Sequence, residues 1–145
     1  MYSRWLKEIL DINGVDGVVV VAKSGEIIEN IGTELEHIQQ QKIAIHVLRL
    51  IAVYDLDQKS VKEIELIWYD YRILVMSASQ FIIIIFCGSN KALSLVRITV
   101  NVVIAHLLED RKLMKKIRKI LSNGSGVLVP EEMSQMEIKL ISKLQ

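Results

Sequence analysis

Cysteine and proline are almost absent from this sequence, which contains one residue of each type among its 145 residues. The single cysteine, Cys87, lies within an apolar run, so the chain forms neither a disulfide framework nor a site of several thiolate metal ligands. The first residues lack the basic and apolar regions of a signal peptide, and no apolar stretch approaches the roughly 20 residues that span a bilayer. These absences predict a cytoplasmic protein without a transmembrane segment.

An excess of charge of either sign is also missing. The chain has 18 basic and 17 acidic residues, a formal net charge of +1, so it has no overall field that would recruit nucleic acid or an anionic membrane. With 51% hydrophobic residues it is on the apolar side for a globular protein. A chain of this length forms one domain and buries roughly two-thirds of its unfolded surface. The additional apolar surface is a first indication of a partner.

The motifs of common catalytic and cofactor sites are absent as well. No Gly-x-x-x-x-Gly-Lys-Ser/Thr loop is present to bind a triphosphate. The histidines His37, His46 and His106 do not have the spacing of metal ligands, and Asp55 with Asp57 lacks the remainder of a calcium loop. No set of nucleophile, base and orienting residue can be assembled from the spacing. We therefore expect no catalytic residues, no metal and no cofactor, and a protein that is not an enzyme.

Buried strands are the strongest structural signal. The run Phe81–Cys87 is apolar at every position and rich in β-branched residues, which is typical of a strand buried on both faces. Residues 17–23 contain four consecutive valines and predict a second such strand, which a Ser-Gly turn joins to a strand at 27–31. Two more strands are predicted at 61–69 and 72–76, and all five fit one antiparallel sheet.

Helices are predicted from the spacing of apolar residues. A short amphipathic helix covers residues 2–10, and a long helix covers 91–121. The helix at 33–54 begins with a capping box, Thr33-Glu34-Leu35-Glu36, and its apolar band is wider than one sheet face requires. The predicted inner stripe of the helix at 91–121 is Leu95, Val96, Thr99, Val102, Val103, His106 and Leu107. The fold class is therefore α/β (α+β), with a five-stranded antiparallel sheet and helices on both of its faces.

The strand at 61–69 is the basis for a predicted homodimer. With strands 17–23 and 81–87 at the centre, it lies at the edge of the sheet, where an apolar strand aggregates unless it pairs. A second copy is the simplest partner, joined through this strand and through helix 33–54. The predicted interface residues are Ile64, Leu66, Trp68, Ile45 and Leu48. Trp68→Glu is expected to give monomeric or insoluble protein.

The opening pattern Leu6-x-x-Ile9-x-x-Ile12-x-Gly14-Val15-x-Gly17, followed by four valines and a Ser-Gly turn, resembles the opening of Roadblock/LC7 domains. The resemblance continues through Leu93-x-Leu95-Val96-Arg97-Ile98 and covers about residues 2–110. The chain departs from it at Asp70-Tyr71, where many members have a glycine turn, and in the extension beyond about Asp110. The resemblance implies a profilin-like three-layer sandwich that dimerises by pairing its edge strands, with the two long helices side by side.

The same resemblance implies a role with small GTPases. Members of the family regulate or scaffold Ras-like small GTPases; one bacterial branch, the gliding-protein-B-like proteins, acts as a GTPase-activating protein in cell polarity, and a eukaryotic branch belongs to dynein. The chain would then be a non-enzymatic homodimeric regulator or scaffold that binds a GTPase across two copies of helix 33–54. The candidate partner-binding residues on that helix are Lys42, His46 and Arg49. Stimulated hydrolysis would use the GTPase's own residues, with an arginine finger from Arg49 as the alternative.

Two other functions are open from the sequence. A structural adaptor within a larger complex differs from the regulator only by its indifference to nucleotide. A small-molecule sensor of the PAS type also surrounds a five-stranded antiparallel sheet with helices, but it needs a pocket with convergent polar groups. The central strands predicted here offer only valine and isoleucine.

The end of the chain has two further features. A basic segment at 111–119 is either a solvated helix end or a docking patch for an acidic partner or a lipid headgroup. Its basic residues are Arg111, Lys112, Lys115, Lys116, Arg118 and Lys119. The predicted domain occupies residues 1–121, and residues 122–145 form a flexible linker and an amphipathic helical tail.

Overall fold

The computed structural model describes residues 3–32, 36–56, 62–68, 71–88 and 93–122, with the backbone alone described at 54–56, 68 and 71. The predicted tail at 122–145 therefore lies outside the described residues, apart from Ser122, and the predicted domain boundary stays a prediction. Of Asp70-Tyr71, where the chain departs from the family pattern, only the backbone at 71 is described, and it begins a strand.

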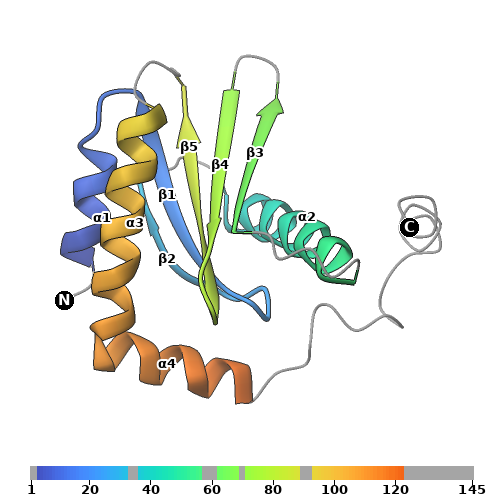
Figure 1. The fold of residues 1–145 in the computed structure, drawn as a ribbon. Coiled ribbons are helices and arrows are strands. Elements are labelled where there is room, and N and C mark those ends of the chain that lie inside the picture. The colour runs from blue at the N-terminus through green and yellow to red at the C-terminus, as the bar shows by residue number, and fades with distance from the viewer. Residues whose placement is uncertain (1–2, 33–35, 57–61, 69–70, 89–92, 123–145) are drawn as a thin grey trace.

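Five strands form one antiparallel sheet in the order β2-β1-β5-β4-β3 (Figure 1). The strands are β1 (Val15–Ala22), β2 (Ile27–Ile31), β3 (Glu63–Trp68), β4 (Tyr71–Ser77) and β5 (Phe81–Cys87). Strands β1 and β5 are neighbours at the centre and β3 is at an edge, as the distribution of apolar residues predicts.

The side chains of β5 explain its central place in the sheet. All seven residues of β5 are buried. Because side chains alternate along a strand, Ile83 and Ile85 enter one hydrophobic core while Ile82 and Ile84 enter a second core on the opposite face. A strand that feeds two cores needs a covering layer on each side.

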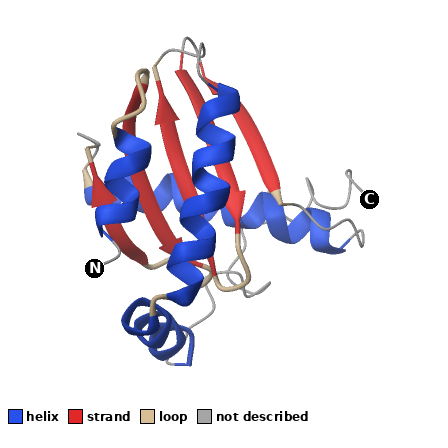
Figure 2. Cartoon of the chain, turned by 60° about the vertical axis from the view of Figure 1, so that its left-hand side comes forward, coloured by secondary structure: helices blue, strands red, loops and turns tan. Residues whose placement is uncertain are grey.

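The described residues contain four helices, three of which supply these layers (Figure 1). They are α1 (Ser3–Leu10), α2 (His37–Leu56), α3 (Leu93–Glu109) and α4 (Arg111–Ser122). Figure 2 shows α1 and α3 side by side on one face of the sheet and α2 behind the other. Between α1 and α3 the rings of Trp5 and His106 are stacked, with centroids 3.8 Å apart. The predicted three-layer α+β fold is confirmed.

The single helix predicted at 91–121 is wrong, because the chain forms two helices that meet at Asp110. The Oδ1 atom of Asp110 accepts a hydrogen bond of 3.0 Å from the backbone N–H of Leu113, so Asp110 caps the first turn of α4. From this point α4 turns away from α3 and crosses the end of the sheet (Figure 1). Apolar periodicity continues through the break, and no glycine or proline marks it.

The predicted inner stripe of α3 is also partly wrong. Leu95 and Val102 are 53% and 50% exposed. The residues of α3 that are buried against the sheet are Val96, Val100, Val103 and Leu107. A helix that is apolar on nearly every side does not reveal its inner face by periodicity.

The described part of α2 begins at His37. The backbone N–H of Glu36 donates to Oε1 of Gln39 at 3.3 Å, which is one half of a capping-box arrangement. The capping box predicted from Thr33 falls mainly on residues 33–35, outside the described part of the chain. At its other end α2 continues to Leu56, slightly beyond the predicted end at 54.

Candidate interaction surface

Strand β3 has one partner strand, β4, and no strand pairs with its other edge within the described residues. On the α2 side, Ile64 and Leu66 pack at the margin of the second core and are half-buried. On the opposite face Ile67 is 69% exposed. An edge strand with free backbone groups and apolar side chains on both faces is a template for another strand.

The side of α2 that points away from the sheet is the second part of the candidate surface. Lys42 and His46 are exposed and Arg49 is half-buried, and their spacing of four and three residues places them in one row along the helix. Ile38, which is 62% exposed, extends the row by one turn. The structure therefore brings the three predicted partner-binding residues of α2 together on one outward surface.

The predicted dimer residues occupy different positions. Ile64 and Leu66 lie on the edge strand, and Ile45 is half-buried on α2. Leu48, at 1% exposure, packs into the second core beneath α2, because it follows Ala44 by one turn on the helix side that faces the sheet. Its side chain therefore belongs to the core of the single chain, and its predicted place in the dimer interface stays a prediction. The side chain of Trp68 is outside the described residues.

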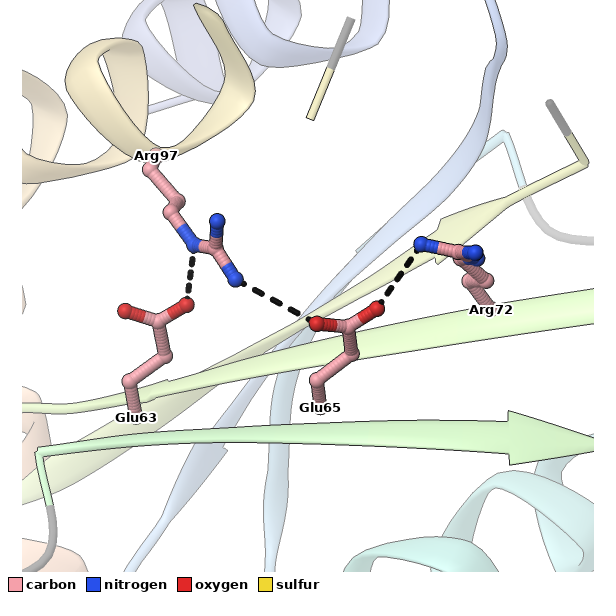
Figure 3. A network of polar contacts seen from close by, with 4 residues as sticks. All are labelled: Glu63, Glu65, Arg72 and Arg97. Carbon is pink, nitrogen blue, oxygen red and sulfur yellow. Dashed lines mark hydrogen bonds and ion pairs between the residues drawn. The ribbon is translucent and has the colours of Figure 1, made fainter. Parts of the chain in front are cut away.

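Four charged residues form a network on the other face of β3 (Figure 3). Arg97 of α3 donates from Nε to Glu63 Oε1 and from Nη2 to Glu65 Oε2, the second bond measuring 3.3 Å. Arg72 of β4 donates from Nη1 to Glu65 Oε1 at 3.0 Å. The bond to Glu63 is the main cause that raises the pKa of Arg97 above its usual value. Two carboxylates and two guanidinium groups leave this part of β3 without net charge.

The network neutralises the charged side chains at this edge of the sheet, but it contributes little to the stability of the chain. Its side chains are 28% to 37% exposed, and exposed ion pairs contribute little to folding. Unpaired glutamates at 63 and 65 would repel the same residues of a second β3 strand, since like charges across a strand pair are unfavourable. The sequence does not reveal that Arg97 reaches these glutamates, because it comes from an element far along the chain.

Other candidate chemistry is limited. Cys87 is 2% exposed, and burial, followed by the negative charge of Asp16, raises the pKa of its thiol. Within the described residues, no group of three or more His, Cys, Asp or Glu side chains is placed to hold a metal ion. Among the helices of the described chain, none combines the length and apolar character required to cross a membrane.

The basic segment does not share the α2 surface. Arg111, Lys115 and Lys116 are exposed on α4, and α4 packs into the core on the α1 and α3 side through Leu113 and Ile117. Helix α2 covers the opposite face of the sheet. The predicted partner-binding residues thus form two separate surfaces, one on α2 and one on α4.

Comparison with known proteins identifies the fold. No protein-family model matches the sequence, and no curated protein matches it. Among solved structures, Myxococcus xanthus MglB superposes with a TM-score of 0.64 at 13% identity, covering 74% of this chain and 92% of the other. A Roadblock/LC7 domain from Streptomyces avermitilis superposes with a TM-score of 0.63 at 11% identity, covering 72% and 93%. A structure of MglB with a tetrameric arrangement gives 0.60 at 11% identity, covering 81% and 88%.

Proposed function

Because the chain has the Roadblock/LC7 fold, we propose that it is a non-enzymatic, homodimeric regulator or scaffold of a Ras-like small GTPase. The observation that carries the proposal is the apolar edge of β3, which no strand of the described residues pairs, beside the outward row of α2. The tetrameric arrangement of one structurally similar protein supports self-association of this fold. The link to a GTPase comes from the resemblance of the sequence to Roadblock/LC7 domains.

In the proposed dimer, two β3 strands pair antiparallel and extend the sheet across both copies. A two-fold axis perpendicular to the sheet relates the copies, so like faces lie on the same side. The two α2 helices then lie next to each other. Lys42, His46 and Arg49 occur twice on the shared surface, which provides a composite docking site for one partner.

The chain acts on its partner rather than on nucleotide, because its sequence has no triphosphate-binding loop. If it stimulates hydrolysis, it does so by positioning the GTPase's own residues. Arg49 as an arginine finger is the alternative, and its removal would then reduce stimulated hydrolysis by roughly 10³-fold or more. Stimulation that survives Arg49→Ala excludes the finger.

A pull-down from the native organism's extract tests the proposal. The tagged protein is incubated with extract in GDP or in a non-hydrolysable GTP analogue, and captured proteins are identified by mass spectrometry. Enrichment of a small GTPase with the analogue alone supports an effector or activating protein. Equal recovery in both nucleotides, or no GTPase, favours the structural adaptor.

A variant of the α2 row makes the pull-down specific to the proposed surface. Lys42→Glu with His46→Glu places two negative charges on exposed positions of α2, and we expect it to lose the GTPase. A matched variant, Lys7→Glu with Arg4→Glu, changes two exposed positions of α1 on the opposite side of the sheet and is expected to retain it. Equal loss in both variants would contradict docking on α2.

A further inference from the structure

Helix α4 has two sharply different sides. It carries six basic residues and no acidic residue. The basic residues, all exposed, are Arg111, Lys112, Lys115, Lys116, Arg118 and Lys119. At 100° per residue they span an arc of about 160° on the helix surface. Leu113 and Ile117 lie on the opposite side, 1% and 0% exposed. We call the six residues the basic face of α4.

The basic face concentrates charge that the rest of the chain lacks. Six of the 18 basic residues are on α4, so the remaining chain has 12 basic against 17 acidic residues, a net charge of −5. In the part of the chain that the structure describes, no carboxylate forms an ion pair with any of the six. Within the described residues, ion pairs therefore do not neutralise this charge.

We infer that the basic face of α4 binds a membrane surface that contains anionic lipid. A cluster of four to eight lysines and arginines on an amphipathic helix matches the diffuse negative potential of such a surface. The apolar side of α4 is buried in the protein core, so the helix rests on the headgroups and does not insert. This association is peripheral and independent of the proposed GTPase partner.

The composition of the face favours lipid over other polyanions. Four of its six residues are lysine, and α4 contains no aromatic residue, asparagine or glutamine. Protein interfaces are depleted in lysine and centre on aromatic or arginine anchors. Binding of single-stranded nucleic acid uses aromatic stacking, and base reading uses bidentate amide or guanidinium groups. An array of lysines on a convex helix has few of these features.

Vesicle flotation of the full chain tests the inference. We expect the protein to float with phosphatidylcholine vesicles that contain phosphatidylglycerol and not with phosphatidylcholine alone, and to be released as the salt concentration rises. Lys115→Glu with Lys116→Glu should lower the partition coefficient by about 25-fold or more, since each lysine near the surface contributes about fivefold. Lys7→Glu with Lys62→Glu makes the same change in net charge at exposed positions outside α4 and should float like the wild type.

Several results would overturn the inference. Equal loss of binding in the two double variants would show that only net charge matters. Flotation that is indifferent to anionic lipid or to salt would remove the electrostatic basis. Tighter binding of the wild type to duplex DNA than to anionic vesicles at the same salt would assign the face to nucleic acid. Thermal unfolding of both variants should match the wild type, because the substituted side chains are exposed.

Discussion

Gly32 connects β2 to the segment that leads to α2, and its position accepts no side chain easily. Its φ is +85°, and a Cβ placed there would lie 2.9 Å from the carbonyl oxygen of Asp16 and 2.7 Å from Leu10 Cδ1. The leucine tip can move, but the backbone oxygen is fixed by β1. We expect Gly32→Ala to lower the free energy of unfolding by about 2 kcal/mol, since a left-handed φ alone costs roughly 1 to 2 kcal/mol with a Cβ.

Gly88 supplies the matched control for this prediction. A Cβ at Gly88 would meet Asp16 Oδ2 at 2.5 Å, which is a side-chain atom rather than a backbone oxygen, and the φ of Gly88 lies outside the left-handed region. Gly88→Ala should therefore cost at most about 1 kcal/mol. Urea unfolding of both variants measures the ranking. Equal losses would show that the contact with the Asp16 carbonyl oxygen and the φ of Gly32 are unimportant.

The thiol of Cys87 makes stability depend on pH in one direction. Burial raises its pKa above the usual 9.0, so the folded chain holds the proton to a higher pH than the unfolded chain. The stabilising contribution is complete below pH 9.0 and is lost as pH rises through the folded pKa. The stability of the wild type relative to Cys87→Ala should be constant up to pH 9.0. Above pH 9.0 it should fall by about 1.4 kcal/mol per pH unit until the folded pKa is reached.

Urea unfolding of both chains across the alkaline range checks this expectation. A difference between wild type and Cys87→Ala that stays constant through the alkaline range would contradict it. Iodoacetamide provides a second readout, because the buried protonated thiol should react on the order of 100-fold more slowly in the folded chain than in urea.

At the scale of single residues, the sequence predicts which side chains are buried better than it predicts which side chains contact each other. The burial of Cys87 followed from its place in an apolar run. The stack of Trp5 on His106 and the reach of Arg97 to Glu63 did not follow from any pattern, because each joins residues that are far apart in the sequence. Such contacts depend on how helices are placed over the sheet, which periodicity within one element does not encode.

At the scale of elements, Asp110 separates α3 from α4 and orients the basic face. Removing the cap in Asp110→Ala leaves the Leu113 N–H without its 3.0 Å acceptor, and we expect a loss of about 1 kcal/mol. Asp110→Asn keeps an acceptor and should lose only a few tenths. Hydrogen exchange along α4 distinguishes the two, with faster exchange in the alanine variant. Identical exchange in both variants would mean that core contacts alone fix α4.

The strands were predictable and the last helices were not, for one physical reason. A strand buried on both faces must be apolar over most of its length. The apolar runs in β1 and β5 therefore predict that these strands lie at the centre of the sheet. Helix α3 is apolar nearly all round, with Ile98 64% exposed, and its inner face is set by the neighbouring α1. The break at Asp110 comes from one side-chain hydrogen bond within an otherwise continuous helical pattern.

At the scale of the whole molecule, the two candidate surfaces lie on separate parts of the fold. Helix α2 covers one face of the sheet, while α4 belongs to the core with α1 and α3 on the other. In the proposed dimer, a two-fold axis perpendicular to the sheet keeps both α4 helices on one side and both α2 helices on the other. The α2 surface would then stay open to a GTPase while the basic face binds lipid.

The fold itself could be predicted from a few positions in the sequence. Gly14 has a φ of 97°, so this glycine of the opening pattern has a backbone role, and a register shift in the pairing of β1 with β5 lies between Val15 and Gly17. The interaction surface could be predicted only in part from the sequence. Leu48 and Ile45 are both apolar, and only the orientation of the helix decides which of them lies in the core and which at the surface.

The edge of β3 provides the decisive test of assembly. Ile67 is 69% exposed in the single chain and pairs in register with Arg72. In a continuous two-copy sheet, Ile67 would gain cross-strand neighbours from the second β3. Ile67→Lys would place a cation there beside Arg72, and charged residues on an edge strand oppose pairing. We expect this variant to be monomeric in analytical ultracentrifugation at concentrations where the wild type is a dimer.

Ile98→Lys is the control, because Ile98 is 64% exposed on the outer side of α3 and the substitution makes the same change in charge and apolar area. It should remain dimeric. The melting temperature of the wild type and of Ile98→Lys should rise with protein concentration, whereas that of Ile67→Lys should not, because a dimer gains stability by mass action. A dimer that persists in Ile67→Lys would place the interface away from β3, and a monomeric wild type would remove the composite α2 surface on which the proposed GTPase docking depends.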